Sequence, residues 1–164
     1  MSLSSICQSL QDTAFSTGIR ESVWTFPIIE TVHLMALAFS VGIIIFVDLR
    51  LIGVGLRDRP VSEVFERLQP MALKGFAINV TSGLLLFISE PVKCYESPYF
   101  RMKLVLLFLL GVNALSFQSF YRGVAAWDKA VVLPGRARAA GWLSLLFWAG
   151  VVVAGRAIAY ASSR

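Results

Sequence analysis

Four long apolar stretches dominate the pattern of hydrophobic and polar positions along the chain. They cover about residues 26–53, 71–90, 102–121 and 139–160. Each is long enough to reach the roughly 20 residues that an α-helix needs to cross the hydrocarbon core of a bilayer. Charged residues, prolines and glycines interrupt the pattern at 57–60, 91–98 and 134–136. We therefore predict an all-α integral membrane protein, in which residues 26–164 form a four-helix bundle with short loops.

Residues 1–25 follow a different pattern. Their apolar residues recur at helical spacing on one face, opposite Ser, Gln and Asp: Leu3, Ile6, Cys7, Leu10 and Ala14. The segment has neither the basic start nor the small-residue cleavage site of a signal peptide. It is expected to be a short amphipathic helix that lies at the membrane interface.

The composition agrees with a membrane protein. Apolar residues make up 57% of the chain and charged residues 15%, and the mean hydropathy is +0.72, which excludes an ordinary soluble domain. The net charge of +5 comes from basic loop residues and gives no reason to expect nucleic acid as a partner. The lipid bilayer is the expected partner, and a second copy of the chain or a membrane redox partner is compatible with this class of protein.

The basic residues are distributed unevenly between the two sides. Eight are in the connections after the first and third spans, at positions 50, 57, 59, 67, 122, 129, 136 and 138, and five are on the other side, at positions 20, 93, 101, 103 and 164. Because basic loops stay in the cytoplasm, both termini are expected outside it. Cys7 and Cys94 would then share the oxidising side, where a disulfide is allowed; the alternative is two unrelated small apolar residues.

Ionisable and amide side chains inside the apolar stretches are the candidate functional residues. An ionisable group at such depth is costly unless it is paired, hydrated or bound to a ligand. The candidates are the only histidine of the chain and five other residues: His33, Glu30, Asn79, Lys103, Asn113 and Arg156. Glu30, His33, Glu90 and Lys103 are expected at a similar depth, and Arg156 is expected to pair with Glu30 or Glu90.

Several kinds of site are disfavoured by the residues available. One histidine and two distant cysteines exclude structural zinc, and the Glu30-x-x-His33 unit occurs once, whereas di-iron bundles use it twice. The methionines show no spacing typical of a copper site. No phosphate-binding glycine loop or nucleophile elbow is present.

Motifs along nearly the whole chain carry a resemblance to a known family. They are the run from Trp24 to His33 (W-x-F-P-x-x-E-x-x-H), residues 48–53 (DLRLIG), 81–87 (TSGLLLF) and 100–103 (FRMK), Asn113, and residues 155–160 (GRAIAY). In these motifs the chain resembles a bacterial family of four-helix membrane proteins of unknown function. The resemblance implies the fold and a place in the bacterial inner membrane, and it implies no activity.

A more distant resemblance bears on chemistry. His33 with the apolar run after it, Glu66-Arg67-Leu68, and the stretch from Gly83 through Glu90-Pro91 to Lys103-Leu104 are similar to HemJ-type protoporphyrinogen oxidases and, more loosely, to CopD-like membrane domains. The HemJ-type resemblance implies a bound b-type haem, with His33 as an axial ligand of its iron. It also implies that Lys103 partners a haem propionate or a substrate carboxylate.

The single histidine limits such a site. Two histidine ligands within one protomer are excluded, so the second axial position would be taken by Met, Lys, water or nothing, or His33 would come from each of two subunits. The haem would lie between the first and third spans, with four aromatic residues as candidate walls: Trp24, Phe87, Phe100 and Tyr160.

Three functions remain open on the sequence. The first is a non-catalytic membrane component in which Glu30, His33, Lys103 and Arg156 form a buried ion network. The second is a b-type haem-binding or haem-pathway redox protein that uses His33. The third is proton-coupled transport or quinone chemistry. The sequence leaves open whether the protein is an enzyme.

Overall fold

Seven helices make up the described part of the chain, which contains no strand. The computed structural model describes residues 3–56, 58–121, 128 and 133–161. The predicted all-α fold with four long apolar helices is confirmed. The helices are α1 (Leu3–Gln11), α2 (Ala14–Arg20), α3 (Thr25–Ile52), α4 (Val61–Ser89), α5 (Pro91–Glu96), α6 (Pro98–Tyr121) and α7 (Gly135–Ala161).

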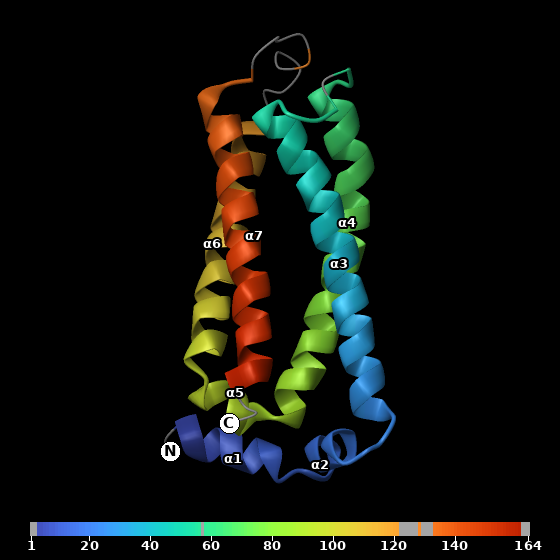
Figure 1. The fold of residues 1–164 in the computed structure, drawn as a ribbon, viewed down its shortest axis with the longest axis vertical. Helices are drawn as coiled ribbons and strands as arrows, with labels where there is room; N and C mark the ends of the chain where they lie inside the picture. Colours follow the sequence, from blue (N-terminus) through green and yellow to red (C-terminus); the bar gives the residue numbers. More distant parts are fainter. Residues whose placement is uncertain (1–2, 57, 122–127, 129–132, 162–164) are drawn as a thin grey trace.

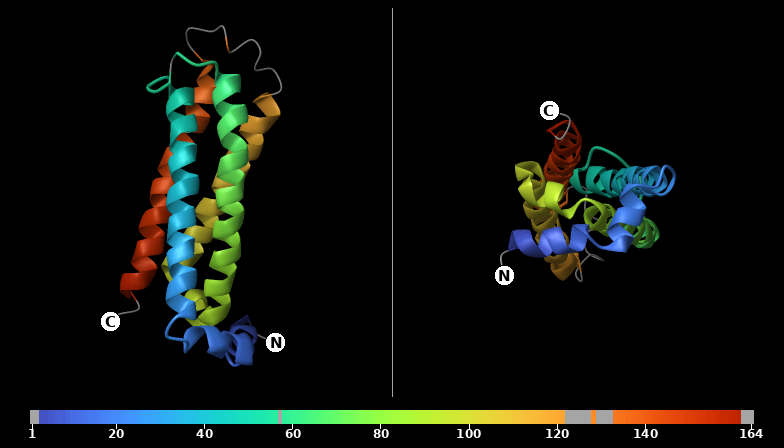
Figure 2. Two further views of the ribbon diagram at one scale, coloured as in Figure 1. Left: turned by 90° about the vertical axis from the view of Figure 1, so that its right-hand side faces the viewer. Right: turned by 90° about the horizontal axis from the view of Figure 1, so that it is seen from below.

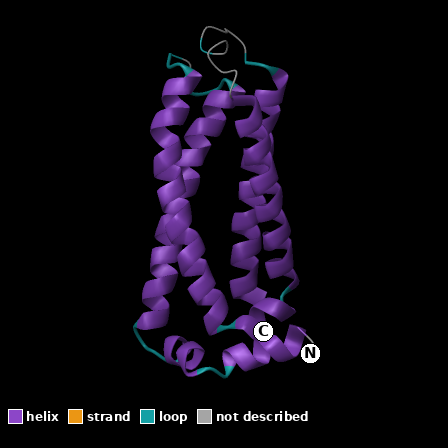
Figure 3. Ribbon diagram, turned by 180° about the vertical axis from the view of Figure 1, so that it is seen from behind, coloured by secondary structure: helices purple, strands orange, loops and turns teal. Residues whose placement is uncertain are grey.

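The four long helices form two pairs (Figure 1). Helix α3 packs along α4, α6 packs along α7, and the pairs meet mainly where α3 contacts α7. At the connection end, where α3 leads into α4, one apolar cluster joins all four helices: Leu51, Val61, Phe117, Leu133 and Ala137. A second cluster around Leu110, Trp148 and Val151 continues the core down the bundle. Toward the opposite end the ribbons of the two pairs lie further apart (Figure 3).

The short helices form a belt across that opposite end, called the belt end here (Figure 2). The hydroxyl of Ser16, which is fully buried, donates to the Ile88 carbonyl at 2.8 Å, and Arg20 Nη1 donates to the Ser89 carbonyl at 3.2 Å. Helix α2 thus satisfies carbonyls that the end of α4 would leave without partners. The predicted N-terminal helical segment is present as two helices, because Thr13 begins α2 by accepting from the Ser16 amide.

The helix boundaries depart most from the sequence prediction at α4. The predicted span begins at residue 71, whereas α4 begins at Val61 and continues through Pro70. The extra turns carry Glu63, Glu66 and Arg67, so they are not apolar and hydropathy does not detect them. The Asp128 carboxylate accepts a hydrogen bond from the backbone amide of Ser62 at 3.0 Å, which caps α4 from a distant part of the chain.

The outer surface of the bundle is apolar. Large hydrophobic side chains are exposed on every long helix, among them Met35 (69%), Leu73 (58%), Phe108 (71%) and Val153 (65%). All four helices are long and apolar enough to cross a membrane, so this surface is suited to lipid. Both ends of the chain lie at the belt end, as four spans require (Figure 1). Arg57, Arg122, Lys129 and Arg164, on which the expected orientation partly rests, lie outside the described residues.

The contact between α3 and α7 depends on a glycine. A Cβ at Gly141 would lie 3.0 Å from the Asp48 carbonyl oxygen and 3.1 Å from Ile52 Cγ1, whereas a Cβ at Gly111 would meet nothing within 4 Å. We predict that Gly141→Ala lowers the free energy of unfolding in detergent by about 1–3 kcal/mol, because a backbone carbonyl cannot move aside cheaply. The control Gly111→Ala should be neutral or slightly stabilising. Equal effects of the two substitutions would contradict this packing.

Candidate functional site

The histidine fixes α3 to α4. His33 Nδ1 lies 3.0 Å from the Asn79 carbonyl oxygen and 3.0 Å from Ser82 Oγ. In return, the side-chain nitrogen of Asn79 (Nδ2) donates to the backbone carbonyl of His33 at 3.0 Å. The ring fits here because its neighbour is a glycine: a Cβ at Gly83 would lie 3.0 Å from His33 Cε1. Two of the predicted site residues, His33 and Asn79, are therefore brought together as reciprocal partners.

These hydrogen bonds favour one tautomer of the imidazole. The Ser82 hydroxyl donates to the Ile78 carbonyl at 2.7 Å, which leaves a lone pair on its oxygen. The Asn79 carbonyl can only accept. Both groups are satisfied when His33 Nδ1 carries the hydrogen, and Nε2 is then an acceptor. Nε2 has no hydrogen-bond partner among the described residues. A histidine held in this way through its other nitrogen is oriented as metal-ligating histidines are.

Lys103 is the charged residue that acts on this histidine. It begins the apolar part of α6, is partly buried, and its Nζ would lie 4.0 Å from a Cβ placed at Gly155 on α7. Its ammonium group is close enough to the His33 ring for the two to interact electrostatically. The ion pairs among the described residues are Arg59–Glu63 and Lys93–Glu90. Lys103 therefore lies close to α7 and acts electrostatically on His33 of α3, without a carboxylate partner in the described chain.

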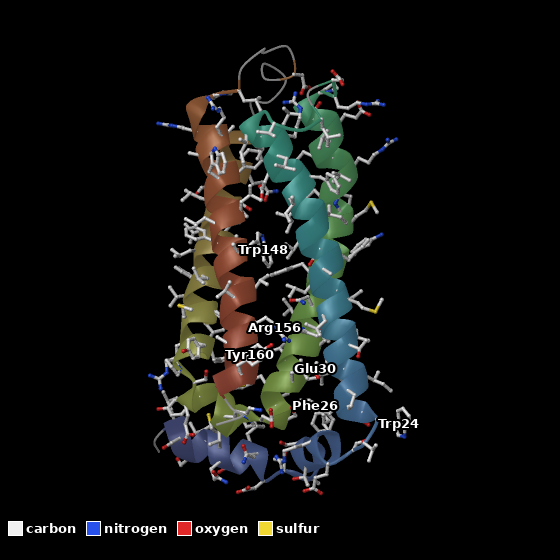
Figure 4. The ribbon with its side chains drawn as sticks, in the orientation of Figure 1. Trp24, Phe26, Glu30, Trp148, Arg156 and Tyr160 are labelled. Atoms are coloured by element: carbon white, nitrogen blue, oxygen red, sulfur yellow. The ribbon has the colours of Figure 1, made fainter. Side chains whose placement is uncertain are left out.

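The other predicted members of an ion network are not joined to it. The guanidinium of Arg156 is 5.1 Å from the ring centroid of Tyr160 and donates to the Tyr160 hydroxyl at 3.2 Å. The prediction that Arg156 pairs with Glu30 or Glu90 is wrong for the described structure, since Glu90 pairs with Lys93 at 2.9 Å. Glu30 is exposed, and Figure 4 places it on α3 and Arg156 on α7, both in the belt-end half of the bundle.

Two further polar residues join helices closer to the connection end. Asn113 Nδ2 donates to the Ala140 carbonyl at 3.0 Å, so this predicted site residue fastens α6 to α7 and is separate from His33. Asp48 on α3 is buried, is hydrogen-bonded by Ser144 of α7, and keeps one buried carboxylate oxygen without a partner in the described chain. We did not predict the Asp48 contact. The signal for it is the small residues at helical spacing on the buried face of α7, Ala137, Gly141 and Ser144.

The four candidate aromatic walls do not form one enclosure. The rings of Phe87 and Phe100 stack with centroids 5.6 Å apart, which joins α4 to α6 near the belt end. Trp24 is 75% exposed and Tyr160 66% exposed, and Figure 4 shows Trp24 at the outer edge of α3. Only Phe87 and Phe100 therefore remain as candidate walls beside Lys103.

Neither a cluster of metal ligands among the described residues nor a known relative points to another site. The described residues contain no group of three or more His, Cys, Asp and Glu side chains placed to hold a metal ion. Comparison with protein-family models, with curated proteins and with solved structures finds no match to the chain.

The two cysteines lie on neighbouring helices at the belt end. Cys7 is on α1 and Cys94 on α5, two helices that pack together, and both are free thiols in the structure. Burial raises the pKa of the Cys94 thiol to about 11, and the nearby Glu90 carboxylate acts in the same direction, while Lys93 and Lys103 oppose it. The prediction that both cysteines lie at one end of the bundle agrees with this placement.

The raised pKa of Cys94 predicts its reactivity. Only the thiolate is alkylated, so in a Cys7→Ser protein the rate of iodoacetamide labelling should keep rising with pH up to about 11. In the chain unfolded with detergent the rate should level off near the ordinary thiol value of 9.0. Mass spectrometry of quenched samples measures both profiles. Identical profiles for the folded and unfolded chains would contradict the burial of Cys94.

Proposed function

We propose that this multi-pass membrane protein binds b-type haem between its two helix pairs, with His33 as an axial ligand and Lys103 as the partner of a propionate. When bound, the haem would supply one-electron redox chemistry. The proposal rests chiefly on one observation: the ammonium group of Lys103, which acts electrostatically on His33, has no carboxylate partner in the described chain.

Lys103 distinguishes this proposal from a purely structural ion network. Charges at membrane depth are normally paired or face a ligand or water. A network that served only stability would neutralise Lys103 with Glu30 or Glu90, but Glu30 is exposed and Glu90 pairs with Lys93. An anionic group of a ligand is the partner that Lys103 still requires, and a haem propionate has this charge.

His33 supplies the second requirement. Its Nδ1 is 3.0 Å from the Asn79 carbonyl, so the lone pair of Nε2 is available in the tautomer that this contact favours. A non-catalytic role, in which His33 only joins α3 to α4, accounts for the contacts of Nδ1. It does not account for Lys103, and it is the second candidate for that reason.

The cellular setting belongs to the same proposal. We place the protein in the bacterial inner membrane with both termini in the periplasm, so that His33 and Lys103 lie nearer the periplasmic face. The candidate partner is a membrane redox protein that exchanges electrons with the haem. A second copy of the chain is the alternative source of the other axial ligand, because each protomer has one histidine.

Optical spectra of the purified protein test this function. Protein from cells supplied with haem should show a Soret band in the oxidised state, and the band should shift on reduction with dithionite. His33→Gln should lose the band, because glutamine can still donate to the Asn79 carbonyl but lacks an imidazole nitrogen for the iron.

The choice of glutamine guards against an unfolded variant. Because the hydrogen bond to α4 is retained, His33→Gln should melt within a few degrees of the wild type when both are free of haem. A stable wild-type protein without a Soret band would rule out the haem proposal, as would a band of equal intensity in the variant.

A further inference from the structure

A pocket lined by both charged and apolar residues opens at the belt end, outside the site of His33 and Lys103. Its volume is about 590 Å³, within the range of roughly 300–1,000 Å³ that small-molecule sites occupy. Residues from five helices and the adjoining turns line it, among them Gln11, Arg20, Glu90, Lys93, Glu96 and Ile158. None of these residues is proposed to hold the haem.

The pocket lies at the level where the apolar spans end. Its wall includes the segment between the end of α4 at Ser89 and the start of α6 at Pro98, together with Ile158 close to the end of α7. The belt helices α1 and α2 supply Gln11 and Arg20. The wall therefore combines apolar groups from the spans with charged groups from the belt, as the headgroup region of a bilayer does.

The charges of the wall are partly neutralised among themselves. Lys93 Nζ lies 2.9 Å from Glu90 Oε2, so these two form a pair. Arg20 donates to the Ser89 carbonyl at 3.2 Å and to Thr17 Oγ1 at 3.4 Å, and neither acceptor is a carboxylate. Glu96 has no ion pair among the described residues. One cation and one anion are thus left on the wall without a countercharge in the described chain.

We infer that this pocket binds the headgroup of a zwitterionic phospholipid with a primary amine, the phosphatidylethanolamine type. The Arg20 guanidinium, which lines the pocket and is held by two oxygen acceptors, meets the phosphate, since its planar fork suits phosphate oxygens. The Glu96 carboxylate meets the ammonium group of the headgroup. Ile158 and the neighbouring apolar surface face the start of the acyl chains.

Native mass spectrometry of the delipidated protein tests this inference with two lipids added back. Phosphatidylethanolamine has the phosphate and the ammonium, whereas phosphatidylglycerol has the phosphate alone. We expect the wild type to retain one phosphatidylethanolamine and to bind it roughly tenfold more tightly than phosphatidylglycerol, the effect of one charge-assisted hydrogen bond.

Two substitutions separate the contributions of the two charges. Glu96→Gln should abolish the preference while leaving phospholipid binding in place, and Arg20→Gln should weaken the binding of both lipids. The matched controls are Glu66→Gln and Arg138→Gln, exposed residues of α4 and α7 nearer the connection end, which should bind like the wild type.

Melting in lipid-free detergent shows whether Arg20→Gln still folds, since Arg20 also contacts the end of α4. Glu96 has no such contact among the described residues, so Glu96→Gln decides the question if Arg20→Gln unfolds. Equal binding of the two lipids by the wild type would overturn the inference, as would a Glu96→Gln variant that keeps the wild-type preference. Neither result bears on the Soret band, so the two proposals fail separately.

Discussion

The arrangement of this bundle depends on one constraint: inside a bilayer, polar groups must find their partners within the protein. Between α3 and α4, His33 and Asn79 satisfy this constraint through reciprocal hydrogen bonds. Between α6 and α7, the hydrogen bond from Asn113 to the Ala140 carbonyl does the same. Asp48 and Ser144 join the two pairs. Two groups depart from it in the described chain: one Asp48 carboxylate oxygen is buried without a partner, and the charge of Lys103 has no carboxylate partner.

The sequence predicts the fold well and the partners of the polar residues poorly, for a physical reason. Apolar length alone identifies four spans, and the structure contains four helices of that kind. The start of α4 was misplaced because residues 61–70 are helical without being apolar. The sequence also places Arg156 within the fourth span, but it does not predict that Tyr160 is the partner of Arg156. A helical pattern predicts the position of a side chain along the helix axis and the face on which it lies. Whether Arg156 contacts Tyr160 or Glu30 depends instead on how the helices pack.

Small residues decide which helices approach each other, and so where the polar groups meet. Gly83 admits the His33 ring against α4, and Gly141 admits the backbone of α3 against α7. Such close contacts are typical of membrane helices, which gain little from hydrophobic burial against each other. The looser belt end, in contrast, holds its charges on short helices around the pocket. One chain thereby combines a tightly packed interior at the connection end with polar surfaces at the belt end.

The role of Lys103 is the central claim, and a titration of the haem-free protein with haemin tests it most directly. Lys103→Met should bind haemin roughly tenfold more weakly than the wild type, since a charge-assisted contact to a propionate is lost. Lys74→Met, which removes an exposed lysine of α4, should bind as the wild type does. Equal affinity of the two variants for haemin would contradict the claim that Lys103 recognises an anionic ligand beside His33.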